Sequence, residues 1–146
     1  MGTEAELPGT GNRPNAESAP KRFRLALQLP WPPSALSPNG QHGHWTRRAE
    51  AKKNFRCACW IATIEQLSPR MRASCVAVVP LQLLLEFVRP DRRSYDRDNL
   101  LARTKAGIDG MCQALGIDDG RFVSITVSVA DEVVAGGLVR VVLVWP

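Results

Sequence analysis

The sequence has no apolar run long enough to cross a membrane, and its first residues lack the apolar stretch of a secretory signal. We therefore expect a cytoplasmic protein with no membrane partner. None of the four cysteines stands in a Cys-x-x-Cys pair, which argues against a zinc site and favours reduced, buried thiols. No internal repeat is visible, and 146 residues leave room for a single domain.

Positive charge exceeds negative charge along the chain. There are 19 lysines and arginines against 14 aspartates and glutamates, which gives a net charge of +5. An excess of this sign favours an anionic partner over a cationic one, although charge alone identifies no ligand. A local gathering of acidic side chains inside such a basic chain points to chemistry on a polyanion.

Two segments have the period of an amphipathic helix. The first spans residues 46–66. The second spans residues 98–115 and stops at Gly116, because glycine is favoured just past helix ends.

Strand patterns surround these helices. Residues 22–29 alternate between apolar and polar side chains, as in a half-buried strand. Residues 74–88 predict one strand or two interrupted at Pro80, and the part after Pro80 is apolar on both sides, which is typical of a central strand. Residues 123–129 and 138–144 predict two more strands.

The order of these elements predicts a single domain of the α+β class over residues 21–146. We expect a small mixed sheet of about four strands packed against two main helices. Residues 1–20 are rich in proline, glycine and small polar side chains and are expected to form a flexible tail.

Acidic residues concentrate around the second predicted helix. Asp96 and Asp98 stand at its start, and Asp118-Asp119 follow its end. At about 100° per residue, Asp98, Lys105 and Asp109 fall within roughly 20° of one line, apart from the apolar stripe. Carboxylates that converge repel each other unless a cation lies between them, and Mg²⁺ takes oxygen ligands while keeping room for a phosphate.

Each acid also has an explanation that needs no ligand. Asp98 suits the N-cap of the helix, and Asp118-Asp119-Gly120 suits a turn. The late pair lies about 25–30 Å further along the helix axis, so Asp119 joins the early pair only if the chain doubles back or another subunit supplies it. An EF-hand is excluded, because the loop lacks its glycine and its final glutamate.

Together with a proline-rich opening, this segment resembles the RusA-type Holliday-junction resolvases. That family has a Leu-Pro-x-Pro-Pro-Ser opening strand, an Asp-x-Asp-Asn-Leu run, a lysine soon after it, and Asp-Asp before a late strand. The matching stretches, in the same order, are residues 29–34, residues 96–100, Lys105 and Asp118-Asp119. Residues 38–45 also resemble a Pro-Asn…His-Trp stretch of phage-type members.

The resemblance implies an α+β homodimer that nicks two strands of branched DNA symmetrically with Mg²⁺ or Mn²⁺. It assigns the metal to Asp96, Asp98 and Asp119, where the metal would activate a water. The expected catalytic residues are Asp96, Asp98, Lys105 and Asp119, supported by Asn99, which orients a ligand or caps the helix, and by Asp118. Lys105 would neutralise a phosphate oxygen. It follows the second aspartate by nearly two helical turns where the family has one, and both spacings keep it on the same face. Arg103 is a poorer candidate because it lies on another side of the helix.

DNA binding is expected from basic and aromatic residues of the loop and the first helix, with two arginines near the acids. These residues are His42, His44, Trp45, Arg47, Arg48, Lys52, Lys53, Arg56, Arg92 and Arg93. Phosphate contacts of this kind make affinity fall steeply with salt. The alternatives are a solvated basic face, a metal-binding pair made by the two histidines, and a charge-balancing role for Arg92 and Arg93.

The sequence therefore predicts a structure-selective endodeoxyribonuclease that acts in DNA recombination and repair. Two alternatives stay open. One is a non-catalytic protein that recognises branched DNA and uses its acids only as caps. The other is a nuclease that cuts other branched replication intermediates.

Overall fold

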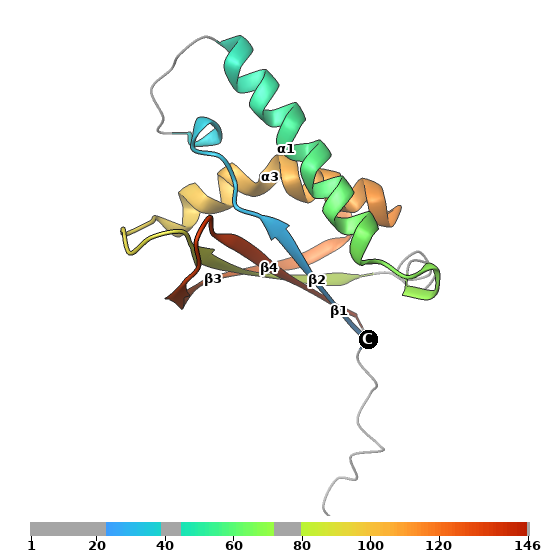
Figure 1. Ribbon diagram of the computed structural model, residues 1–146. Helices are drawn as coiled ribbons and strands as arrows, with labels where there is room; N and C mark the ends of the chain where they lie inside the picture. The colour runs from blue at the N-terminus through green and yellow to red at the C-terminus, as the bar shows by residue number, and fades with distance from the viewer. Residues whose placement is uncertain (1–22, 39–44, 72–79, 146) are drawn as a thin grey trace, which may run out of the picture.

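The computed structural model describes residues 23–38, 45–71 and 80–145 (Figure 1). Four strands form one sheet in the order β1-β4-β2-β3. Their bounds are Phe23–Pro30 for β1, Leu81–Arg89 for β2, Phe122–Val133 for β3 and Leu138–Trp145 for β4. Strand β4 pairs antiparallel with β1 and β2, whereas β2 and β3 are parallel. The sheet is therefore mixed, and β2 is central, as the sequence predicts.

Two long helices, α1 (Trp45–Gln66) and α3 (Arg97–Leu115), lie on the same face of this sheet (Figure 1). Both begin within one residue of the predicted position, and α3 ends at Gly116, which adopts the left-handed conformation with φ of 74°. Short 3₁₀ turns stand at Ser34–Leu36 (η3) and Asp119–Arg121 (η4). The predicted α+β class is confirmed. In the described part of the chain, no helix has the length and apolar character needed to cross a membrane.

The core lies between the sheet and the helices. In β1, β2 and β4, alternate side chains point to the helices and are buried. These residues are Leu25, Leu27, Leu29, Leu81, Leu83, Leu85, Phe87, Val139, Val141 and Leu143. Burial of each such side chain stabilises the fold by about 1.5–3 kcal/mol, which explains why the alternating pattern fixes the register.

Helices α1 and α3 cross closely because α3 carries glycine at the crossing. A Cβ on Gly107 would lie 2.6 Å from the Phe55 ring and 2.7 Å from the Cys59 sulfur. A Cβ on Gly110 would collide with the backbone carbonyl oxygen of Arg56. The two glycines therefore set the distance between the helices.

The expectation of buried cysteines holds only in part. Cys59 and Cys112 are buried, whereas Cys57 is exposed on α1, and Cys75 lies outside the described residues. The predicted tail of residues 1–20, and the part of the predicted strand that precedes Pro80, lie outside the described residues.

Candidate active site

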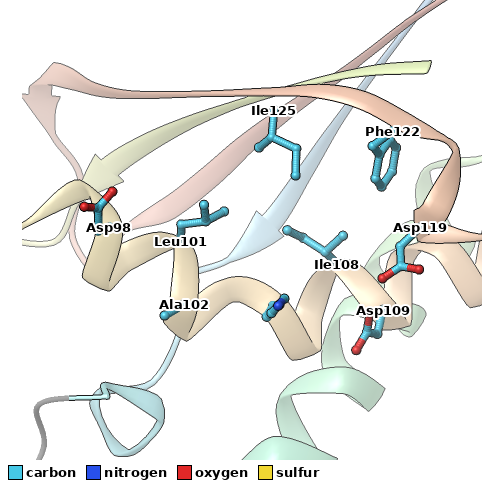
Figure 2. Close-up of a pocket in the computed structure, with 9 residues that line it drawn as sticks. Asp98, Leu101, Ala102, Ile108, Asp109, Asp119, Phe122 and Ile125 are labelled. Atoms are coloured by element: carbon cyan, nitrogen blue, oxygen red, sulfur yellow. The ribbon is translucent and has the colours of Figure 1, made fainter. Parts of the chain in front are cut away.

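A groove of about 400 Å³ lies between α3 and the edge strand β3 (Figure 2). Its apolar lining is formed by Leu101, Ala102, Ile108, Phe122 and Ile125. Its charged lining is formed by Asp98, Lys105, Asp109 and Asp119. The helical spacing predicted one line for the first three of these, and that prediction is confirmed. Three of the four expected catalytic residues therefore share one groove, and Asp96 is not among its lining residues.

The groove is acidic at its two ends rather than at one point. Figure 2 shows Asp98 at one end and Asp109 beside Asp119 at the other. Asp98 and Asp109 are about 16 Å apart along the helix axis, because each residue adds about 1.5 Å. A hard cation holds its oxygen ligands at roughly 2.0–2.6 Å, so one ion does not reach both ends.

The topology of the sheet explains this separation. Helix α3 is the crossover between the parallel strands β2 and β3, so it runs from the C-terminal end of β2 back to the N-terminal end of β3. These two strand ends lie on opposite sides of the sheet along the strand direction. Asp98 lies just after the end of β2, and Asp119 lies just before the start of β3. Among the described residues, no three His, Cys, Asp or Glu side chains form a group that could hold a metal ion. The ligand set that the resemblance implies does not come together in one chain.

At the start of α3, Asp96 rather than Asp98 is the N-cap. The Asp96 carboxylate accepts a hydrogen bond of 3.0 Å from the backbone N–H of Asp98. Asp98 is left exposed in the first turn, where the helix dipole favours a negative charge. Asn99 makes a different contact, because its Oδ1 accepts from the hydroxyl of Ser37 at 2.9 Å and ties the segment after η3 to α3. Asn99 therefore does not cap the helix.

At the other end, the late acidic pair forms the turn that the sequence allowed. The Asp118 carboxylate accepts from the Gly120 N–H at 3.1 Å and caps η4. That bond, together with the hydrogen bond from Asp119, holds the Asp118 pKa below its ordinary value. The Asp119 pKa is raised, first by the hydrogen bond to Asp118, then by desolvation and by the nearby Asp109 charge. Negative charge is crowded here, and a cation or a lysine would relieve it.

The expected cation of the site is exposed. Lys105 lines the groove between its two acidic ends, and among the described residues no carboxylate lies within ion-pair distance of it. It is therefore available to an anionic ligand. Arg103, on another side of α3 as predicted, is only 7% exposed and lies outside the groove.

Arg103 has a structural role that the sequence did not indicate. Its Nη2 donates to the Pro32 carbonyl oxygen at 2.7 Å and its Nε to that of Pro33 at 3.3 Å. Its guanidinium also lies 5.8 Å from the centre of the Trp31 ring, which packs edge-on against Tyr95. The proline-rich opening is thus held to α3. The sequence does contain a signal for this role. Arg103 lies close to the buried side of the predicted helix, and no acidic residue lies one turn away to pair with it.

The expected DNA-binding residues fall into three groups. Those on α1 are all exposed: Trp45, Arg47, Arg48, Lys52, Lys53 and Arg56. His42 and His44 lie outside the described residues. Near the acids, Arg92 and Arg93 are both exposed, and Arg93 pairs with Asp91 at 3.7 Å, which supports a charge-balancing role for it.

Comparison with known proteins gives a family but no activity. No family model matches the chain. A protein of Xylella fastidiosa (strain Temecula1), named only "Uncharacterized protein", is 40% identical over 121 residues, which cover 81% of this chain and 74% of the relative. The chain belongs to the same family as that protein. The relative's name states no substrate, so the function has to be argued from the groove.

Proposed function

We propose that the chain is a Mg²⁺-dependent, structure-selective endodeoxyribonuclease of the RusA type, with Mn²⁺ as an alternative metal. Its substrates are Holliday junctions or similar branched DNA, cut by paired nicks during recombination and repair. The observation that carries the proposal is the groove that holds Asp98, Lys105 and Asp119, three of the residues that the resemblance assigns to catalysis. Lys105 is placed to neutralise a phosphate oxygen between acidic groups.

One chain does not supply the metal ligands, so the proposal includes a homodimer. A two-fold axis across the middle of the groove would bring the Asp98 end of one protomer to the Asp119 end of its partner, and the reverse, as an isologous interface requires. The edge strand β3 supports this pairing, because Val123 and Ile125 are 67% and 47% exposed beside the groove. An exposed apolar edge strand is a common surface for association.

A second candidate is a branched-DNA-binding protein without catalysis. The observation in its favour is that Asp96 and Asp118 act as caps and that the acids stay in two groups within one chain. Caps need no metal. Cutting of branches other than four-way junctions is a variant of the first proposal and differs from it only in substrate.

Cleavage of a synthetic four-way junction decides between the two candidates. The full chain is incubated with the junction in Mg²⁺ and, separately, in EDTA, and nicks are mapped on each labelled strand. The nuclease proposal expects paired, symmetric nicks in Mg²⁺ and none in EDTA. Binding of the junction without nicks in either Mg²⁺ or Mn²⁺ favours the second candidate, and a panel of flaps and forks then tests the remaining variant.

A further inference from the structure

One flank of α1 carries a second feature that the groove does not explain. Two tryptophans lie on this flank: Trp45, at the start of the helix, is 79% exposed, and Trp60, six residues before its end, is 39% exposed. Neither tryptophan belongs to the buried face of the helix, which is formed by Phe55, Cys59 and Thr63.

At about 100° per residue, two tryptophans and three cations of α1 fall within an arc of roughly 100°, which also holds Ala49 and, beyond Trp60, the buried Thr63. We name this surface the basic arc, and its residues are Trp45, Lys52, Lys53, Arg56 and Trp60. The two carboxylates of the helix, Glu50 and Glu65, point outside the arc. Among the described residues, no carboxylate lies within ion-pair distance of its three cations. The arc is therefore an uncompensated positive surface with an indole at each end.

The arc lies next to α3 at Arg56. A Cβ on Gly110 would lie 3.2 Å from Cγ of Arg56, so the Arg56 side chain starts at the crossing of the two helices. Gly110 follows Asp109, which lines the acidic end of the groove on another side of α3. The arc and the groove are therefore close to the same part of α3.

We propose that the basic arc binds an unpaired DNA strand, whose bases stack on Trp60 and Trp45 while its phosphates contact Lys52, Lys53 and Arg56. The proposal deepens the nuclease function and rests on it for the source of the strand, which is the opened part of a branched substrate. Trp45 and Trp60 are about 22 Å apart along the axis, because 15 residues separate them at about 1.5 Å each.

A duplex fits this surface less well. Paired bases are stacked on each other and show a duplex-binding helix only phosphates and base edges, so two exposed indoles would contribute little. An unpaired strand offers the faces of its bases, and stacking on an aromatic side chain is sequence-tolerant. The arrangement of basic and aromatic groups is therefore that of a single-strand platform.

The test is a binding measurement in EDTA with the full chain. The probes are a fluorescein-labelled oligothymidine of about 12 nucleotides, within the usual range of a stacking platform, and the same strand in a duplex. We expect tighter binding of the single strand, and a loss of about fivefold to a hundredfold in that binding for Trp60→Ala and Trp60→Leu. Trp60→Phe should retain most of the affinity. Ile61→Ala is the matched control, because Ile61 is 44% exposed but lies outside the arc. This variant should bind the single strand as tightly as the wild type does.

Two results overturn the proposal: unchanged single-strand affinity in Trp60→Leu, or an equal loss in Ile61→Ala, which would indicate a general apolar surface for a protein partner. Trp60→Leu keeps an apolar side chain, and its circular dichroism spectrum, which should match that of the wild type, tests whether the fold is intact. Arg56→Gln should lower the slope of log affinity against log salt by about 0.7, and an unchanged slope excludes a phosphate contact there. Because no metal is present, these results stand whether or not a junction is cut.

Discussion

Arg103 on α3 donates a hydrogen bond of 2.7 Å to the carbonyl oxygen of Pro32, which precedes it by 71 residues. The guanidinium is buried without an ion-pair partner among the described residues, and this burial lowers its pKa from the ordinary value, since the charged form is desolvated. Carbonyl oxygens and the Trp31 ring take the place of a carboxylate. The contact fixes the proline-rich opening against the helix that carries the candidate site.

Replacing Arg103 tests that contact. Arg103→Met keeps the apolar stem and removes both hydrogen bonds to Pro32 and Pro33, so we expect a loss of about 1.5–3 kcal/mol in the free energy of unfolding. Urea unfolding followed by tryptophan fluorescence measures it. Arg47→Met is the matched control, since Arg47 is exposed on α1 and should change stability by less than about 0.5 kcal/mol. Equal stability of the two variants would contradict the structural role of Arg103.

The helix crossing gives a second prediction. Gly110→Ala places a Cβ against the backbone carbonyl of Arg56, so we expect a loss of about 1–3 kcal/mol in stability, although alanine is the better helix former. Gly120→Ala is the control, because its nearest atom would be 3.7 Å away and its φ is not positive. The midpoints of thermal unfolding compare the two. A stable Gly110→Ala protein would mean that the helices are further apart than described.

The cysteines provide a prediction about pH. Burial raises the pKa of Cys59 and of Cys112 to about 12, and near Cys112 the acids Asp119, Asp109 and Asp118 add to the shift. Since a raised pKa keeps the thiol protonated, these two residues should stay unreactive toward iodoacetamide from about pH 7 to pH 10 in the folded protein. Exposed Cys57 should be alkylated readily in that range. Peptide mass spectrometry measures each site, and early alkylation of Cys112 would contradict its burial.

The fold prediction rested on the spacing of apolar residues along the sequence. Alternating leucines in β1 and the turn signal at Gly116 are local patterns, and the structure agrees with them within one residue for α1 and α3. The mixed character of the sheet was also predicted, and the structure agrees with it. The strand order β1-β4-β2-β3 was not predicted, because pairing between distant strands leaves little local signal.

The sequence predicted several residues that line the groove, but it did not predict how they are arranged relative to one another. Helical spacing correctly put Asp98, Lys105 and Asp109 on one groove. The position of Asp119 depends on whether β3 runs parallel to β2, which sequence spacing does not give. The structural role of Arg103 was not predicted for a similar reason, since its acceptors are backbone carbonyls of residues far away in the sequence.

The role of Asp98 is tested by a substitution that removes only charge. In Asp98→Asn, we expect cleavage of a four-way junction to fall by about a hundredfold or more, while junction binding in EDTA stays unchanged. Asp131→Asn is the control, because Asp131 is also exposed but lies outside the groove. Strand nicking and gel-shift assays measure the two properties. Wild-type cleavage by Asp98→Asn would end the nuclease proposal.

The separation of Asp98 from Asp119 makes mixed variants the most direct test of the whole account. Asp98→Asn and Asp119→Asn should each be inactive alone, since each removes one group from both sites of a dimer. When the two variants are mixed in equal amounts and allowed to exchange subunits, half of the dimers become heterodimers. Each heterodimer has one intact site of its two, so about a quarter of the wild-type nicking should return. No recovery, with exchange of subunits shown by differently labelled protomers, would contradict a site shared between two chains.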